Sequence, residues 1–296
     1  MSEAQGASRA ALAAAFLTCT AIWSSTFLFI RLGNATVPPL WAAALRLGLA
    51  GALLWIWVAT HPKDAPRGAG LGPAVVYGFL QFGINFPLLY WSETVVPSGL
   101  SAVMYANVPL ATALMAHALG VERVTRAKIL GSVSALAGVA IIFASELSGR
   151  VAALPLIAGF VAPMAATLGT VLLKRGPAQS AIGVNALGCA IGFVLCLALS
   201  VVAREPHALP RTMASVFPIL YLTVAGSLGA FVLWAWLVHH APISRISYIA
   251  VLVPLCALVL GAIVAHERMP PLTLAGSAVV LIGVGQGMRA PASRTR

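Results

Sequence analysis

Charged side chains are scarce in this sequence of 296 residues: they make up 8% of the chain, whereas hydrophobic side chains make up 60%. Water-soluble domains carry roughly 25% charged residues. No stretch of this chain could therefore build a polar surface that faces water over most of its area. The scarcity of charge excludes a soluble enzyme or a soluble binding domain and leaves an integral membrane protein.

Residues that could build a metal site, a disulfide or an active site are also few. Each of the four cysteines lies inside an apolar run, away from loops and without metal-ligand spacing: Cys19, Cys189, Cys196 and Cys256. We expect them to be small packing residues. An intramembrane enzyme would need a cluster of His, Asp or Glu at membrane depth. The one histidine well inside an apolar run, His117, has no acidic partner, so we expect no enzyme, no metal and no cofactor.

Ten apolar runs are long enough to cross the hydrocarbon core of a bilayer, which takes about 20 residues. Charged and turn-forming residues separate them into these predicted spans: Ala10–Ile30, Pro38–Thr60, Leu71–Trp91, Ser98–Gly120, Ala127–Ser145, Val151–Leu173, Ala181–Ala203, Met213–His239, Ser244–Ala265 and Pro271–Met288. The first run is too long for the hydrophobic region of a cleaved signal peptide, so it is expected to remain as a span. The sequence predicts an all-α, polytopic membrane protein with short loops.

Basic residues indicate how the spans are oriented. The 18 Lys and Arg residues give a net charge of +11, yet they lie in short loops rather than in a patch with interleaved aromatics, which argues against nucleic acid as a partner. With both termini inside the cell, inner segments carry twelve basic residues and outer segments five, while Arg46 lies within a span. Cytoplasmic loops carry the excess of positive charge, so both termini are predicted to be cytoplasmic.

The chain contains an internal repeat at an offset of 145 residues. The segment from Pro97 to Val139 matches the segment from Pro242 to Val284 with 11 identities in 43 positions, including scarce proline, glutamate and arginine residues. Each repeat would hold five spans, an odd number, so the second would insert upside down relative to the first. Inverted repeats of this kind exchange conformations between their halves to alternate access, with the substrate site near the midplane. Transport is the leading functional hypothesis.

The predicted organisation follows from this duplication. It comprises an N-terminal cytoplasmic tail, a first five-helix repeat, a second five-helix repeat and a C-terminal cytoplasmic tail, at residues 1–9, 10–145, 151–288 and 289–296. Because one chain supplies both halves, we expect a monomer whose partners are the lipid bilayer and a small-molecule substrate.

A span with a proline, then a glutamate at its exit, then Gly-x6-Gly in the next span, occurs twice. The residues are Pro109, Glu122, Gly131 and Gly138, then Pro254, Glu267, Gly276 and Gly283. This double pattern resembles the drug/metabolite transporter superfamily, specifically its EamA-type members, whose chains run to two such repeats and ten helices. Trp23-Ser24 and Arg46 look like the family's N-terminal pattern, although Cys189 stands where a second copy of Arg46 would be.

The resemblance implies a multi-pass protein of the bacterial inner membrane that moves a small metabolite. Within the family, the chain's length and aromatic residues look similar to YddG-type aromatic amino-acid exporters. Amino acids, aromatic ones in particular, are therefore the expected substrates. Drugs or other small metabolites are the alternative substrates, and a channel is the alternative mechanism.

Polar residues inside the third and fourth spans are candidates for the substrate site. Tyr77, Gln81 and Asn85 follow each other at intervals of four residues, so on an α-helix they share one face. Ser101 and Tyr105 lie on one face of the fourth span. Polar stripes are unfavourable against lipid, so each should face a wet cavity or another helix.

Four further positions complete the candidate site. Pro109 and Pro254 lack the backbone donor of other residues and can leave a carbonyl free at mid-membrane, or can simply kink their helices. Arg46 needs an acceptor, which could be a substrate carboxylate or a backbone carbonyl. Trp23, with Tyr77, Tyr105 and Tyr248, could stack on a flat substrate or serve packing alone.

Other aromatic and glycine residues have structural interpretations. Aromatic residues near the predicted span ends are typical of interfacial belts: Trp55, Trp57, Tyr90 and Trp91. The fifth and tenth spans are the least polar and are rich in glycine, so we expect them to pack closely as a scaffold away from the cavity.

Acidic residues are absent from the interior of every predicted span. All seven lie in termini, loops or span edges: Glu3, Asp64, Glu93, Glu122, Glu146, Glu205 and Glu267. A proton-coupled exporter of lipophilic cations would need a carboxylate within the membrane. We therefore expect a neutral or zwitterionic substrate, moved by facilitated diffusion or by a coupling without a buried acid. Glu122 and Glu267 are expected to cap helices or to pair with basic residues.

Overall fold

The structure is a computed structural model that describes residues 7–96, 101, 104–142, 144, 152–264 and 271–289, with the backbone alone at 257–264. Every regular element within these ranges is helical. Five long helices are continuous: α1 (Arg9–Asn34), α2 (Pro39–Thr60), α9 (Ala153–Arg175), α10 (Ala181–Val202) and α15 (Pro271–Arg289). The predicted all-α class is confirmed for the described chain.

Two further long helices are built from several segments. The first, Gly68–Ser92, contains η2 (Gly68–Gly70), α3 (Leu71–Gly78), the π-helical segment η3 (Phe79–Ile84) and α4 (Asn85–Ser92). The second, Met213–His240, contains α11 (Met213–Tyr221), the π-helical segment η4 (Leu222–Ala230) and α12 (Phe231–His240). Single π-helical turns inside α-helices frequently occur at functional sites.

Seven of the described helices are therefore long and apolar enough to cross a membrane. The other helical elements are shorter: η1 (Pro62–Asp64), α6 (Val108–Ala118), α7 (Arg126–Ile142), α13 (Ile243–Ile246) and α14 (Ile249–Val264). They fall in or beside the fourth, fifth and ninth predicted spans, or in the loop after α2, and parts of those three spans lie outside the described residues. The count of ten spans stays a prediction.

Side chains and prolines determine where several helices begin. Ser8 accepts a hydrogen bond from the Ala11 amide and so caps α1. Proline occupies the first turn of α2, where its missing N–H leaves no intrahelical bond unmade. The Glu205 carboxylate, from the loop after α10, accepts hydrogen bonds from the amides of Leu40 and Trp41 at 3.2 and 2.8 Å. This carboxylate joins the start of α2 to a distant part of the sequence.

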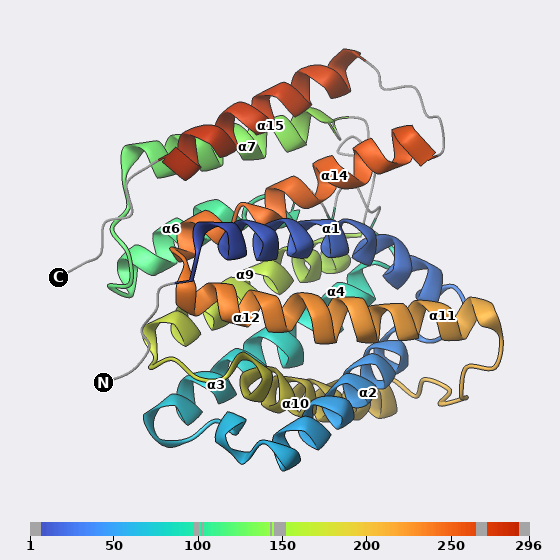
Figure 1. Cartoon of the computed structure of the whole chain (residues 1–296). Helices are drawn as coiled ribbons and strands as arrows, with labels where there is room; N and C mark the ends of the chain where they lie inside the picture. Colours follow the sequence, from blue (N-terminus) through green and yellow to red (C-terminus); the bar gives the residue numbers. More distant parts are fainter. Residues whose placement is uncertain are drawn as a thin grey trace.

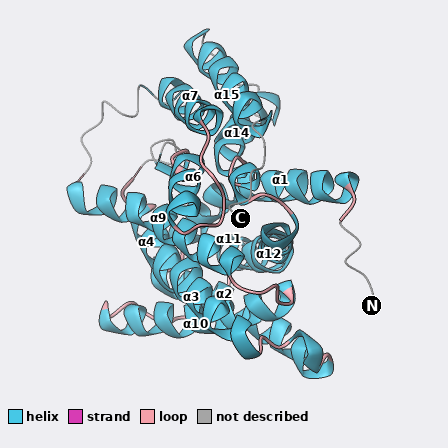
Figure 2. Ribbon diagram, turned by 90° about the vertical axis from the view of Figure 1, so that its left-hand side faces the viewer, coloured by secondary structure: helices cyan, strands magenta, loops and turns pink. Residues whose placement is uncertain are grey.

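The helices run roughly side by side, and two pairs lie on opposite sides of the bundle (Figures 1 and 2): α7 with α15, and α2 with α10. A Cβ atom added at Gly131 would lie 2.6 Å from the Gly287 nitrogen, and one at Gly138 would lie 2.6 Å from the Val280 nitrogen. Only glycine permits so close a backbone approach. The expectation that these glycine-rich helices pack as a scaffold is confirmed.

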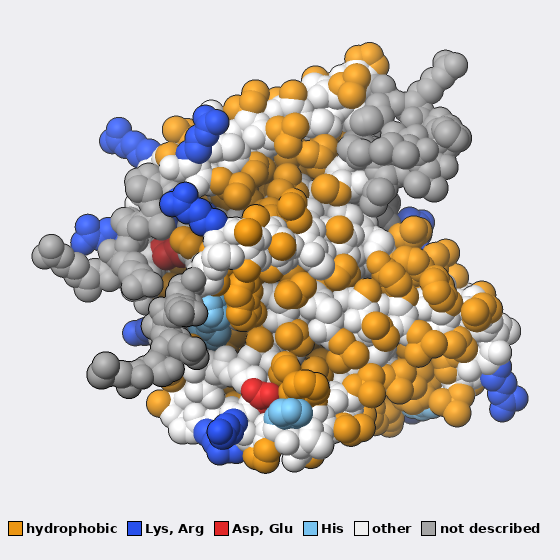
Figure 3. All heavy atoms as spheres, viewed as in Figure 1, with side chains coloured by type: hydrophobic (Ala, Val, Ile, Leu, Met, Phe, Trp, Pro, Cys, Tyr) orange, Lys and Arg blue, Asp and Glu red, His pale blue; other side chains and the backbone are white. Residues whose placement is uncertain are grey.

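The outside of the bundle is apolar over the face shown in Figure 3, where Lys and Arg side chains gather toward the ends. Large hydrophobic side chains such as Leu17, Leu154 and Val194 are exposed. In water, contiguous apolar surface of this extent would drive association. The chain is therefore a multi-pass membrane protein whose exposed side chains face lipid.

Candidate functional site

One cavity lies among helices that are far apart in the sequence. Its volume is about 130 Å³, and its walls come from α1, α2, η3, α4, α6, α9 and α12–α14. Aromatic and aliphatic side chains form most of the walls, with a few polar groups among them. Binding sites for small molecules commonly have this composition, in which a few polar groups orient the ligand.

The structure brings five of the ten predicted site residues into this cavity: Trp23, Arg46, Gln81, Asn85 and Tyr105. They come from α1, α2, the long helix Gly68–Ser92 and the stretch just before α6. The sequence pattern could assign these residues only to faces of separate helices, and the fold brings them together around one cavity.

Arg46 is the charged group of the cavity wall. Its side chain is 1% exposed; Nε donates to Ser227 Oγ at 2.9 Å and Nη1 donates to Tyr90 Oη at 3.3 Å. The guanidinium carbon lies 4.8 Å from the centre of the Phe86 ring, a cation–π arrangement. Nη2 has no hydrogen-bond partner among the described residues. The described residues thus leave one donor group of this buried guanidinium without an acceptor.

Gln81, Asn85 and Tyr105 form a connected polar group on another wall. The Tyr105 hydroxyl donates to Asn85 Oδ1 at 2.8 Å, and Asn85 Nδ2 donates to the Gln81 carbonyl oxygen at 3.2 Å. The π-helical segment η3 contains Gln81 and ends just before Asn85. The wider turn leaves the Gln81 carbonyl near the Asn85 side chain, so the polar group is built from backbone and side chain together.

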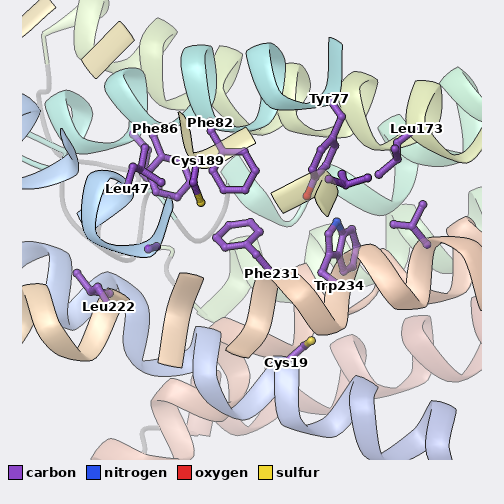
Figure 4. Packing of buried hydrophobic residues seen from close by; sticks show 14 of the residues in the cluster. Cys19, Leu47, Tyr77, Phe82, Phe86, Leu173, Cys189, Leu222, Phe231 and Trp234 are labelled. Atoms are coloured by element: carbon purple, nitrogen blue, oxygen red, sulfur yellow. The ribbon is translucent and has the colours of Figure 1, made fainter. Parts of the chain in front are cut away.

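Aromatic rings close the cavity around these polar groups. The Trp23 ring lies 5.3 Å from the Phe231 ring and 5.4 Å from the Trp234 ring, measured between centroids, and Phe27 lies 5.4 Å from Tyr105. Figure 4 shows Phe82 and Phe86 pointing toward Phe231 from the facing helix. Rings at these separations interact favourably in tilted and edge-to-face geometries. A flat apolar group would meet ring faces and edges on several sides.

Tyr77, Ser101 and Tyr248 do not line the cavity. Tyr77 is fully buried near the cavity, and its hydroxyl has no hydrogen-bond partner among the described residues. The π-helical segment η3 lies between Tyr77 and Asn85, so the uniform α-helical spacing assumed from the sequence does not describe this helix. Tyr248 packs against α7 and α15 instead, with its hydroxyl 3.2 Å from Ser132 Oγ.

The two predicted prolines lie outside the lining as well, in different settings. Pro109 is at the start of α6 after a turn at residues 106–107, so it begins a helix rather than kinking one. Pro254 lies inside α14 and removes the amide that would bond the carbonyl of Ala250, a residue that lines the cavity. Pro254 therefore lies inside a helix, whereas Pro109 follows an interruption of the helical path at residues 106–107.

Several contributors to the site were not predicted from the sequence. Tyr90, expected at an interfacial belt, is buried and accepts a hydrogen bond from Arg46, whereas Trp55, Trp57 and Trp91 are exposed as that belt requires. Ser227 reaches Arg46 from η4, and α9 adds Pro163, Thr167 and Thr170 to the lining. The sequence signal for Ser227 was a small polar residue in a glycine-containing stretch of an apolar span, which is a weak signal.

Glu122 holds the α6–α7 turn against the start of α13. Its carboxylate accepts from the Ile243 amide and from Ser244 Oγ, both at 2.5 Å, and pairs with Lys128 Nζ at 3.0 Å. The expectation that Glu122 caps a helix or pairs with a basic residue is confirmed. Glu267 lies outside the described residues. Among the described residues, no group of three His, Cys, Asp or Glu side chains could hold a metal ion.

The model of the EamA-like transporter family matches the chain twice, at residues 10–144 and 153–285. The two matches cover most of the sequence and contain every lining residue of the cavity.

Several relatives resemble the chain over most of its length. "Uncharacterized inner membrane transporter YedA" of Escherichia coli K12 is 27% identical over 89% of this chain and 86% of its own. A "Probable amino-acid metabolite efflux pump" of the same organism is 27% identical over 90% of this chain and 91% of its own. A "Probable terminal-alkyne amino-acid exporter" of Streptantibioticus cattleyicolor is 28% identical over 88% of each chain.

One solved crystal structure has the same fold. It superposes with a TM-score of 0.75 at 18% sequence identity, and the match covers 94% of this chain and 96% of the other. At this identity the likeness concerns the fold alone.

Proposed function

The chain belongs to the EamA-like transporter family, and we propose that it exports zwitterionic amino acids, aromatic ones preferred, across the bacterial inner membrane through the cavity around Arg46. The names of two relatives, an amino-acid metabolite efflux pump and an amino-acid exporter, support this substrate class. The name of a third, an inner membrane transporter, supports the location.

The unsatisfied Nη2 group of Arg46 carries the proposal. Burying a guanidinium is costly unless acceptors surround it, and this one has two neutral hydroxyl partners and a ring face. Guanidinium groups bind carboxylates through charge-assisted hydrogen bonds. A substrate carboxylate is the acceptor that the cavity lacks.

The neighbouring walls suit the rest of an aromatic amino acid. The oxygens of Gln81, Asn85 and Tyr105 can accept hydrogen bonds from an ammonium group, since all three residues line the cavity. Trp23, Phe231 and Trp234 offer faces and edges to a flat side chain. Drugs or other small metabolites without a carboxylate are the alternative, and they would offer no carboxylate oxygen to Arg46 Nη2.

The proposed topology is ten spans in two inverted five-helix repeats, at residues 10–145 and 151–288, with both termini cytoplasmic. This topology is supported by the way in which the first helix of each half packs along the third long helix of the other half. Helix α9 packs along α3, η3 and α4, as α1 packs along α11, η4 and α12. The π-helical segments η3 and η4 occupy equivalent places in the two halves, and α1 begins at the end of the bundle where α15 finishes (Figure 1). Such repeats alternate access by exchanging conformations, and the proposed unit is a monomer.

Counterflow of labelled amino acids in proteoliposomes tests the proposal. We expect saturable counterflow of aromatic amino acids, with Arg46→Gln weakening their apparent affinity about 10- to 100-fold, because a hydrogen bond to a charged group contributes about 1.5–3 kcal/mol. Arg9→Gln at the exposed start of α1 is the matched control and should behave as wild type.

A second comparison separates carboxylate binding from a folding defect. Wild type should discriminate an amino acid from its amide, which lacks the carboxylate, and Arg46→Gln should lose that discrimination while Arg46→Lys keeps part of it. Equal transport of acid and amide by wild type would refute carboxylate binding at Arg46. Ion conductance without saturable counterflow would favour a channel.

A further inference from the structure

Glu93 is a buried carboxyl group that the substrate site does not use. It directly follows α4, and the residue is only 5% exposed. Neither of its carboxyl oxygens has a hydrogen-bond partner among the described residues. Removing an ionised carboxylate from water without compensating partners costs several kcal/mol, so such a group favours its neutral form. The sequence placed Glu93 at a span edge, and its burial arises only in the fold.

Among the described residues, the surroundings of Glu93 contain little opposing charge. Burial of its carboxyl group raises the pKa of Glu93 to about 7, against opposing effects of Ser101 and of Arg31 at the end of α1. Among the described residues, Tyr105 also interacts with it electrostatically. From α2, Arg46 reaches Tyr90 one turn before it. Helix α9, joined to α4 by a hydrogen bond from Ser92 to the Pro155 carbonyl, carries no titratable side chain before Lys174.

Glu93 lies at one end of the helix that forms a wall of the substrate cavity. Leu89, one turn before it, and Asn85, two turns before it, both line the cavity. At 1.5 Å per residue, the backbone of Glu93 is about 12 Å along the helix from that of Asn85. Under the proposed topology this end faces the outside of the cell, so opening the cavity outward would expose Glu93 to water.

We propose that Glu93 is a proton-binding site, and that closing the outer end of the cavity takes up one proton there. In the closed form the carboxyl group is buried and holds its proton; in the outward-open form it is hydrated and ionises. The inference rests on the proposed function for its orientation, and it replaces the expectation that no buried acid takes part in transport.

The direction of the pH effect follows from linkage. The group has a raised pKa in the closed form, so closure is most favoured below the ordinary value of 4.5 and loses that advantage as pH rises through about 7. Between pH 8 and pH 6 the ratio of closed to outward-open protein should rise about tenfold. The effect should depend on the pH of the outer solution.

Infrared spectroscopy of the purified chain, without substrate, tests the proton site. Titration should show one protonated carboxyl band that disappears near pH 7 in wild type and is missing in Glu93→Gln. Asp64→Asn, at a half-buried carboxylate near the opposite end of the bundle, is the matched control and should keep the band. A wild-type band that titrates only near the ordinary pKa of a glutamate would refute the proton site, whatever the protein transports.

Labelling tests the link to closure. A cysteine at Ser101, in a chain whose four native cysteines are replaced by alanine, should react about tenfold faster with an outside maleimide at pH 8 than at pH 6, after correction for thiolate fraction. Addition of Glu93→Gln should abolish this difference and leave the slow rate at both pH values. A pH difference that persists in Glu93→Gln would refute the proposal. Absent amino-acid counterflow alongside the expected band would overturn the proposed substrate and leave the proton site standing.

Discussion

Two buried glutamates, Glu93 and Glu122, follow helices at opposite ends of the bundle, and their surroundings differ. Glu122 is 7% exposed and has an amide, a hydroxyl and an ammonium group as partners. Glu93 is 5% exposed, and neither of its oxygens has a hydrogen-bond partner among the described residues. Similar burial therefore has different consequences: Glu122 is a structural tie between segments, and Glu93 is the proposed proton-binding site.

The largest expected effect comes from removing the charge of Glu122, the glutamate whose carboxylate has three partners. Glu122→Gln leaves the Lys128 ammonium, a residue 3% exposed, without its anionic partner. Removing one partner of a buried ion pair costs about 3–5 kcal/mol. Thermal unfolding in detergent should show this loss, and Lys128→Met added to Glu122→Gln should restore part of it. If the single variant unfolded like wild type, Glu122 would not be a structural tie.

Much of this fold could be predicted from the sequence, because length and hydropathy decide which segments can cross a bilayer. Seven of the expected spans correspond to long apolar helices. The internal repeat also predicted the helix-capping role of Glu122, since a glutamate recurring at the same span exit has a local function. Glycine spacing likewise predicted the close pairing of α7 with α15.

The candidate site was less predictable because it depends on helix phase and on contacts between distant segments. The π-helical segment η3 interrupts the helix between Tyr77 and Asn85, whereas the spacing of residues alone assumes a uniform α-helix. Tyr90 has the sequence position of an interfacial tyrosine, yet it packs against α2 and meets Arg46. Glu93, at the end of α4, interacts with Arg31 of α1 and with Ser101, and these residues come together only in the fold. None of these contacts has a local signature.

The second effect is a pH dependence of stability that comes from Glu93. Since Glu93 has a raised pKa in the folded chain, folding is most favoured at low pH through this group, and that contribution is lost as pH rises from about 4.5 through about 7. Glu93→Gln should therefore be more stable than wild type at pH 8, by at most about 3 kcal/mol, and nearly equal to it at pH 5. Denaturation at both pH values measures this. A uniform change at both pH values would indicate lost packing rather than a titrating carboxyl group.

The smallest effect is expected from a variant that removes one hydrogen-bond partner of the Glu122 carboxylate and leaves the other two in place. Ser244→Ala deletes the hydroxyl that donates to Glu122 Oε2 at 2.5 Å, while the Ile243 amide and Lys128 stay in place. A single hydrogen bond to a charged group contributes about 1.5–3 kcal/mol, and the remaining donors can take over part of the bond. We therefore expect a loss of about 1 kcal/mol in the free energy of unfolding, well below that of Glu122→Gln.

The matched control for a nearby buried serine is Ser247→Ala, because the Ser247 hydroxyl donates to the Ser244 carbonyl instead of to Glu122. A loss in Ser244→Ala as large as in Glu122→Gln would mean that the Ser244 hydroxyl, rather than the ion pair with Lys128, stabilises the buried Glu122 side chain. The contrast with Glu93 would then depend on one serine.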